Sequence, residues 1–197
     1  MTMMVVRTEV EIPEGIKARL EGTLLKVEGP AGRAEKTLEN PRVTVGIAAA
    51  SGSDNGGLRK IVIEGHDEGK KTKSVVNSFE SHVKNLLRGV QHGFRYELEI
   101  VQSHFPIKLH IDAAAKDIRI ENFVGEKKPR HSQIKSGVTV KTDGKSVTVE
   151  GADLEQVAQT AGSLECATRV VRKDRRRYQD GIYLMKKKGI QMVKEET

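Results

Sequence analysis

Short stretches of the chain alternate hydrophobic and polar residues, which is the spacing of strands with one buried face. The first of them runs from Val6 to Ile12. Others lie at residues 16–20, 25–29, 61–65, 94–101, 107–111, 118–122, 138–141 and 146–149. Asp143-Gly144, between the last two, is a strong hairpin signal. These segments predict antiparallel strands in both halves of the chain.

Two longer stretches repeat hydrophobic residues every three or four positions, which predicts amphipathic helices. The first runs from Val75 to Val90, and the second from Leu154 to Leu164. Asp153 and Gln156 stand where a capping box would begin the second helix. Each half of the chain therefore consists of strands followed by one helix, and this repetition predicts two similar domains.

The expected fold class is α+β, with two tandem similar domains, each an antiparallel β-sheet with one amphipathic helix packed on a face. Between Gly89 and Gly93 the first helix is expected to end before a new strand begins at Phe94. The predicted domains are therefore residues 1–90 and 91–197.

Two glycine-containing segments are interpreted as connections. Residues 46–57, rich in Ala, Gly and Ser, are expected to form a flexible loop between two strands of the first half. Gly29-Pro30-Ala31-Gly32 has the GxxG form with which KH domains clamp a nucleic-acid backbone, but there the loop joins two helices. Here it joins two predicted strands, so a hairpin turn is favoured.

Composition narrows the class of protein. The chain has 197 residues, of which 37% are hydrophobic, enough to build a core. Its longest uncharged run, Val43 to Ser53, is shorter than the roughly 18 apolar residues of a membrane helix, and the N-terminus has no apolar export-signal region. Cys166 is the single cysteine, so an internal disulfide is impossible. We expect a cytoplasmic protein without a membrane partner.

The net charge of +7 is concentrated in one segment. Between Cys166 and Lys188 there are nine basic and two acidic residues, so this segment alone carries +7 and the remainder sums to zero. Smaller basic clusters occur at Lys70, Lys71 and Lys73, and at Lys127, Lys128 and Arg130. A near-neutral body with one cationic segment is typical of a protein that binds a polyphosphate.

One segment imitates a nucleotide-binding motif. Residues 65–72 follow a strand and open a helix as a P-loop does, but three residues separate the glycines where a P-loop has four, and Lys71 separates Lys70 from Thr72. Asp67 and Glu68 also place negative charge where phosphates would lie. A nucleotide-binding enzyme using Gly65 to Thr72 therefore stays as an alternative, and a basic helix start is favoured.

The histidines show no metal-ligand spacing, and Cys166 offers no cysteine cluster, so no metal site and no cofactor are expected. Ser, His and carboxylate residues form no spacing motif of a catalytic site. In the cationic segment, Arg169–Arg177 and Lys186–Lys188 are two basic runs, and Asp180-Gly181 is expected to form a turn between them. With no Trp, four Phe and three Tyr, recognition of RNA shape and backbone is favoured over base stacking.

Several of these segments match a known family. They are the turns at residues 12–15 and 27–32, the helix end Asn85–Val90 with Gly93-Phe94, the hairpin end Val149–Gly151, and the C-terminal set Lys173, Arg176, Asp180-Gly181-Ile182-Tyr183 and Lys186. Tyr178 stands where the family has Phe, and Cys166 where it has Gln. Over nearly its full length the chain resembles the universal large-subunit ribosomal protein L six family, in its archaeal and eukaryotic branch.

The resemblance implies a structural constituent of the large ribosomal subunit, located in the cytoplasm on the ribosome, that is not an enzyme. It implies binding to large-subunit (23S-type) rRNA near the sarcin–ricin loop, at the base of the lateral stalk, where translational GTPases dock. The residues expected to contact RNA are Arg169, Arg172, Lys173, Arg175, Arg176, Arg177, Tyr178, Lys186, Lys187 and Lys188, with Lys127, Lys128, Arg130 and His131 as a second patch.

The expected partners are rRNA, neighbouring ribosomal proteins at the stalk base and, in proximity, translational GTPases, and no homo-oligomer is expected. Lys70, Lys71 and Lys73 are expected to face stalk proteins or solvent. A further alternative is a protein-interaction module of the stalk base without specific RNA binding, in which neutral exposed surface would carry the affinity.

Overall fold

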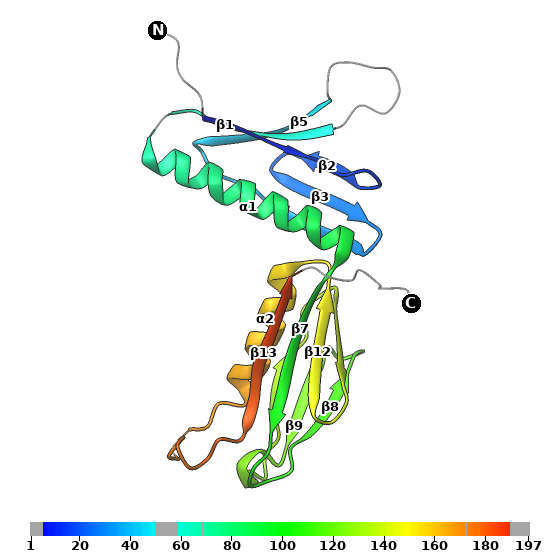
Figure 1. Cartoon of the computed structure of the whole chain (residues 1–197), viewed down its shortest axis with the longest axis vertical. Coiled ribbons are helices and arrows are strands. Elements are labelled where there is room, and N and C mark those ends of the chain that lie inside the picture. Colours follow the sequence, from blue (N-terminus) through cyan, green and yellow to red (C-terminus); the bar gives the residue numbers. More distant parts are fainter. Residues whose placement is uncertain (1–5, 50–58, 68, 172, 190–197) are drawn as a thin grey trace. The chain divides into compact units, whose positions relative to one another are not determined.

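The computed structural model describes residues 6–49, 59–67, 69–171 and 173–189. The chain forms two compact units, Met1–His92 and Gly93–Thr197, and the described part of each contains antiparallel strands and one α-helix (Figure 1). The predicted fold class is therefore confirmed. Within the described residues, neither helix is long and apolar enough to cross a membrane.

The first unit contains two three-stranded sheets. One has the order β1 (Val6–Glu11), β6 (Arg59–Gly65), β5 (Val43–Ala49), and the other follows the chain through β2 (Lys17–Glu21), β3 (Leu24–Gly29) and β4 (Gly32–Thr37). Helix α1 (Lys70–His92) packs against the strands of this unit. It begins at the basic residues Lys70 and Lys71, as predicted. Its apolar face joins a core in which Leu25, Ile61 and Val83 have no exposed surface.

The predicted hairpin at Gly29–Gly32 is confirmed, since Gly29 pairs with Gly32 across β3 and β4. The turn also docks on the end of α1, because the Ala31 amide donates to the Val90 carbonyl oxygen at 2.8 Å. A Cβ atom on Gly29 would lie 2.6 Å from that same oxygen. Glycine is thus required here by close approach of two backbones.

The loop predicted at residues 46–57 is wrong for its first four residues. Gly46–Ala49 continue β5 and pair with β6, with Gly46 opposite Val62 and Ile47 opposite Ile61. The small residues are held in the strand by hydrogen bonding to a central strand, which overrides their weak strand propensity. The rest of the predicted loop, residues 50–57, lies outside the described residues.

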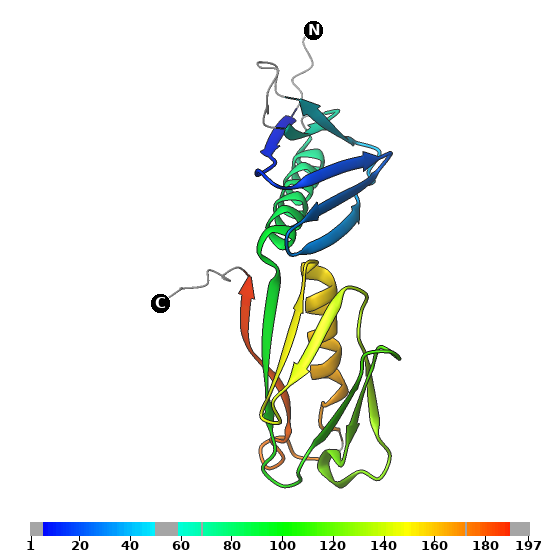
Figure 2. The same ribbon diagram turned by 90° about the vertical axis from the view of Figure 1, so that its right-hand side faces the viewer.

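The second unit combines a four-stranded sheet, a three-stranded sheet and one helix (Figure 2). The four-stranded sheet has the order β11 (Val138–Thr142), β12 (Ser146–Gly151), β7 (Phe94–Val101) and β13 (Gly181–Gly189). The other has the order β10 (Arg130–Gln133), β9 (Asp117–Glu121) and β8 (Lys108–Asp112). A short 3₁₀ helix, η1 (Phe123–Gly125), follows β9.

Helix α2 (Leu154–Ala167) begins at Asp153, whose side chain accepts a hydrogen bond from the Glu155 amide at 2.9 Å. This confirms the predicted helix start. The core beneath α2 includes the fully buried Leu164, together with Leu98 of β7 and Ile118 of β9. The helix and both sheets of this unit therefore share one core.

Strand β13 lies at the edge of its sheet and pairs with β7. Ile182 stands opposite Ile100, and Leu184 opposite Leu98, so both point to the core face. The register then shifts by one residue at Met185, which is 61% exposed. Beyond this β-bulge Lys186 pairs with Glu97.

Candidate nucleic-acid interface

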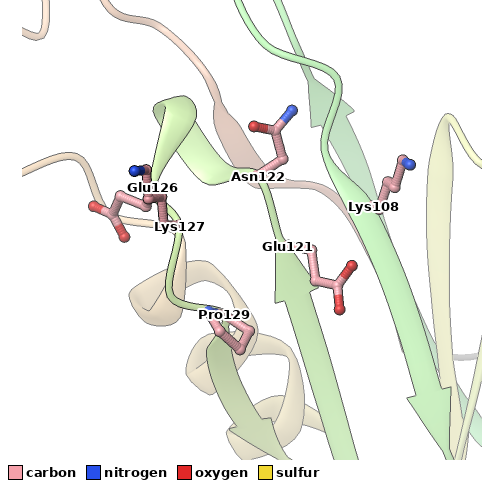
Figure 3. A pocket seen from close by; sticks show the side chains of 6 residues that line it. All are labelled: Lys108, Glu121, Asn122, Glu126, Lys127 and Pro129. Carbon is pink, nitrogen blue, oxygen red and sulfur yellow. The ribbon is translucent and has the colours of Figure 1, made fainter.

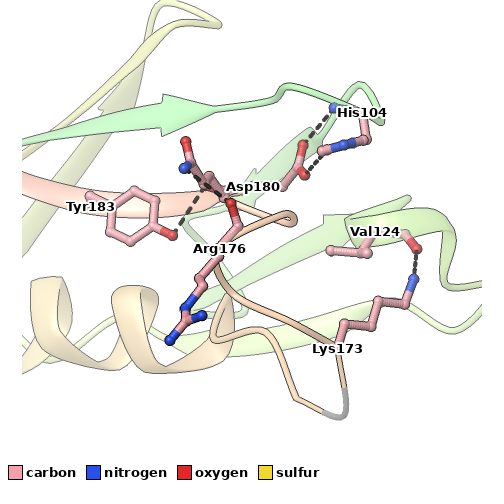
Figure 4. A network of polar contacts seen from close by, with 7 residues as sticks. His104, Val124, Lys173, Arg176, Asp180 and Tyr183 are labelled. Carbon is pink, nitrogen blue, oxygen red and sulfur yellow. Dashed lines mark hydrogen bonds and ion pairs between the residues drawn. The ribbon is translucent and has the colours of Figure 1, made fainter.

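Three loops meet at the end of the second unit where β7 stops and β13 begins (Figure 4). They are residues 102–107 after β7, residues 122–129 around η1, and residues 168–180 between α2 and β13. We call residues 169–179 the cationic loop and the three segments together the loop cluster. Hydrogen bonds join the three segments, since Asp180 contacts His104 and the Lys173 side chain contacts Val124.

The turn in the cationic loop begins at Asp174 and does not lie at Asp180-Gly181 as predicted. The Asp174 carbonyl oxygen accepts from the amides of Arg177 and Tyr178, at 3.1 and 2.9 Å, and its side chain accepts from the Arg176 amide at 3.0 Å. Asp180 has no exposed surface and Gly181 already belongs to β13. The prediction was wrong because Asp180 is held inside the protein by His104, a residue distant in sequence.

Besides Lys173, six basic residues of the loop cluster are exposed, and within the described residues no carboxylate pairs with their side chains. They are Arg169, Arg175, Arg176 and Arg177 from the cationic loop and Lys127 and Lys128 from the segment after η1. The structure thus brings together the two basic patches that lie about forty residues apart in the sequence. Arg172 lies outside the described residues.

Lys173 and Tyr178 are partly engaged within the protein. The Lys173 ammonium donates to the Val124 carbonyl oxygen at 3.3 Å and lies 4.8 Å from the centre of the half-buried Tyr178 ring. That ring also contacts His104, with 4.9 Å between the ring centres. These side chains brace the loop, so less of their surface is free for a ligand than the sequence suggests.

The Arg130 side chain forms its hydrogen bonds with other residues of the protein. Its guanidinium donates to both Glu126 carboxylate oxygens, at 2.8 and 2.6 Å, and to the carbonyl oxygens of Ala167 and Arg169, both at 2.9 Å. The group also lies 4.3 Å from the centre of the Phe123 ring. The hydrogen bond from Arg130 holds the pKa of the Glu126 carboxyl below its ordinary value. Arg130 thus joins η1 to the end of α2.

His131 follows on β10 and pairs with Asp117, with 2.7 Å between Nδ1 and the carboxylate oxygen. Lys186, Lys187 and Lys188 are on β13, where Lys186 lies 3.9 Å from Glu97. At about 3.3 Å per strand residue, Lys186 is roughly 16 Å along β13 from Gly181. These lysines therefore follow the strand beyond the loop cluster and do not belong to its three segments, and the side chain of Lys188 lies outside the described part of the structure.

A pocket of about 420 Å³ lies beside the loop cluster (Figure 3). Its walls come from β8, from the last residue of β9 and from residues 122–129 of the loop cluster: Lys108, Glu121, Asn122, Glu126, Lys127 and Pro129. Lys108 and His104 are the two residues of this region that sequence reasoning missed. Neither belongs to a basic run, so no local pattern marked them.

In the segment that resembles a P-loop, a backbone amide that would bind phosphate is already bonded to Asp67 of the same segment. The Asp67 carboxylate accepts a hydrogen bond from the Gly69 amide at 2.6 Å, which is an amide that a bound phosphate would need. The neighbouring Thr72 hydroxyl and the hydrogen bond from the Gly69 amide lower the pKa of the Asp67 carboxyl, so the group stays charged. Glu68 lies outside the described residues. Among the described residues no cluster of three or more potential metal ligands occurs.

Comparison with known proteins gives consistent matches. Residues 105–181 match the family model described as Ribosomal protein L6. The chain is 41% identical over 178 residues to large ribosomal subunit protein uL6 of Natronomonas pharaonis, a match that covers 90% of this chain and 94% of that protein. The proteins of the same name from Ignicoccus hospitalis and Haloquadratum walsbyi are 38% and 40% identical, and the matches cover 89% and 92% of this chain and 91% and 96% of theirs.

Proposed function

Because the chain belongs to the family of large ribosomal subunit protein uL6, we propose that its loop cluster binds large-subunit rRNA. Membership of this family makes the protein a structural, non-enzymatic constituent of the large ribosomal subunit, and so of the cytoplasmic ribosome. It also removes the nucleotide-binding enzyme from consideration, in agreement with the closed segment at Asp67.

One observation carries the proposal. Seven exposed cations from two distant segments, Lys173 included, gather at one end of the second unit, without carboxylate partners among the described residues. Surface cations are usually paired or dispersed, whereas a cluster without counter-charges is suited to neutralising converging phosphates. The guanidinium groups of Arg175, Arg176 and Arg177 can each donate two parallel hydrogen bonds to a phosphate.

The finer placement follows from the family resemblance. The RNA bound is proposed to lie near the sarcin–ricin loop, and the protein at the base of the lateral stalk, beside the site where translational GTPases dock. The first unit is proposed to face the stalk proteins. The cations would hold rRNA helices in place, and the protein would shape a site without taking part in its chemistry.

Lys127, Lys128, Lys173 and the four described arginines of the cationic loop are proposed as the main contacts. Lys186 and Lys187 are proposed as a separate contact along β13, and Lys188, whose side chain lies outside the described residues, is proposed from the family resemblance alone. Tyr178 and His131 are proposed to contribute edges of half-exposed rings, and Arg130 to act through the loop that it holds.

Binding to an rRNA fragment that contains the sarcin–ricin region tests this proposal. The purified protein is titrated with that fragment over a range of salt concentrations, with an unrelated RNA of equal length as the control. Selective binding with a steep salt dependence is expected. Weak binding that is equal for both RNAs would contradict the proposal and favour a protein-interaction module without specific RNA binding.

A further inference from the structure

The cationic loop is tied to the protein at both of its ends. At its start, the buried Thr168 hydroxyl donates to the Leu164 and Glu165 carbonyl oxygens and accepts from the Ile182 amide at 3.0 Å. The Arg130 guanidinium also binds the Arg169 carbonyl oxygen. The first residues of the loop are thereby joined to the end of α2 and to the beginning of β13.

At its far end the loop is held by Asp180. The carboxylate is completely buried, and one of its oxygens accepts from the His104 amide at 2.8 Å while the other lies 2.7 Å from Nδ1 of the His104 ring. Burial raises the pKa of the Asp180 carboxyl, but hydrogen bonds from His104 and from the Ser103 amide outweigh it, and the pKa lies below its ordinary value. A charged acceptor is therefore kept inside the protein, three residues after a run of arginines.

Two contacts of Tyr183 also join the end of the cationic loop to β13. The Tyr183 hydroxyl donates back to the Gln179 carbonyl oxygen at 3.1 Å (Figure 4). Its ring covers Gly181, where an added Cβ would lie 3.1 Å from the ring. Between them, Ile182 is buried in the core. All four residues of Asp180-Gly181-Ile182-Tyr183 are thus used for packing and hydrogen bonds within the protein.

We propose that Asp180 and His104 are positioning residues for RNA binding, which hold the cationic loop in its binding conformation before RNA arrives. This inference rests on the proposed function of the loop cluster. A loop that is ordered in the free protein loses less conformational entropy on binding, so its arginines bind phosphates more tightly than the same residues in a mobile loop.

If Asp180 acted on RNA binding through its charge alone, its replacement would change the RNA affinity in the opposite direction. Asp180 carries negative charge close to the proposed phosphate contacts, so its neutralisation would strengthen RNA binding if charge alone mattered. The positioning role predicts that Asp180→Asn weakens binding by about fivefold or more, because an amide offers one acceptor oxygen where the carboxylate offers two charged ones. His104→Ala, at a 38% exposed side chain, is expected to weaken binding in the same direction.

Asp153→Asn is the matched control. This substitution makes the same change of charge in the same unit, and asparagine caps a helix as well as aspartate does. The RNA affinity of the Asp153→Asn variant is therefore expected to stay within about twofold of that of the wild-type protein. Binding of all variants to the sarcin–ricin fragment is measured over a salt series. The variants at 180 and 104 are expected to keep the salt slope of the unchanged protein, because no phosphate contact is removed.

Loop order is measured separately by hydrogen exchange in the absence of RNA. Exchange at the amides of Arg177 and Tyr178, which bond to Asp174, is expected to accelerate in Asp180→Asn and His104→Ala, while the α2 amides stay protected. Equal or tighter RNA binding by these variants, or unchanged exchange in the loop, would overturn the positioning role. Failure of the unchanged protein to select its RNA would instead contradict the proposed function.

Discussion

Arg130 and Glu126 form a bidentate ion pair at the border of the loop cluster, with donor–acceptor distances of 2.8 and 2.6 Å. Because the same guanidinium also binds two backbone carbonyl oxygens at the end of α2, Arg130→Lys removes a planar fork that an ammonium cannot reproduce. We expect a loss of about 1 to 3 kcal/mol in the free energy of unfolding, measured by urea denaturation.

Lys128→Ala is the comparison for this variant, since Lys128 is exposed and lies in the neighbouring segment. It is expected to change the free energy of unfolding by less than about 0.5 kcal/mol while weakening RNA binding. A stability loss in Lys128→Ala equal to that in Arg130→Lys would refute the distinction between a structural and a contacting cation.

Replacement of Arg175, Arg176 and Arg177 by Ala tests the phosphate contacts directly. The three side chains are exposed, so folding is expected to be unaffected, as judged by circular dichroism and urea denaturation. RNA affinity should fall, and the slope of log affinity against log salt should become shallower by roughly 0.7 to 0.9 for each phosphate that is no longer neutralised. An unchanged slope would mean that these arginines do not contact phosphates.

The lysines of β13 should act independently of the cationic loop. Lys186 and Lys187 lie roughly 16 Å or more along the strand from Gly181, and among the described residues no hydrogen bond or ion pair joins them to the cationic loop. The change in binding free energy for the combined variant of Lys186→Ala, Lys187→Ala and the three arginine substitutions should equal the sum of the two sets within about 0.5 kcal/mol. A larger departure would show that both regions bind one continuous RNA element.

Acid should weaken the unit that contains Asp180. The carboxyl has a lower pKa in the folded protein than its ordinary value of about 3.9 in an unfolded chain. Its contribution to stability is therefore fully present above about pH 4 and is lost as the pH falls through the folded pKa. Asp180→Asn should be less stable than the unchanged protein by about 1 to 3 kcal/mol at neutral pH.

The difference in the free energy of unfolding between Asp180→Asn and the wild-type protein should shrink as the pH is lowered below about 4, because the protonated carboxyl of Asp180 resembles the amide of asparagine. Urea denaturation of both at neutral pH and in acid measures this difference in the free energy of unfolding. A difference that is the same under the two conditions would show that the charge of Asp180 is not what stabilises the fold.

Much of the fold followed from local patterns, because helix α1, the hairpins and the start of α2 depend on residues that are neighbours in sequence. The environment of Asp180 did not, since its partner His104 is 76 residues away and nothing near Asp180 marks it as buried. Arg130 was placed among the RNA contacts for the same reason, because two of its acceptors are 37 and 39 residues distant. Charge counts locate a basic surface, but they do not tell which cations are already engaged.

Gly29→Ala should destabilise the first unit. The added Cβ would lie 2.6 Å from the Val90 carbonyl oxygen, so the turn or the end of α1 must shift, at a cost of about 1 to 3 kcal/mol. Gly46→Ala is the control, since a Cβ there meets nothing within 4 Å. Thermal unfolding of both variants makes the comparison, and equal midpoints would show that the turn does not need its close approach to α1.

The bulge at Met185 decides to which face of the sheet the side chains after it point. Without it, Lys186 would have the same parity as Ile182 and Leu184 and would point to the core face. Loss or gain of one residue inverts the phase of every side chain that follows. In a run of three lysines, lysine occupies the same positions in either phase, so the residue types at these positions do not depend on whether the bulge is present.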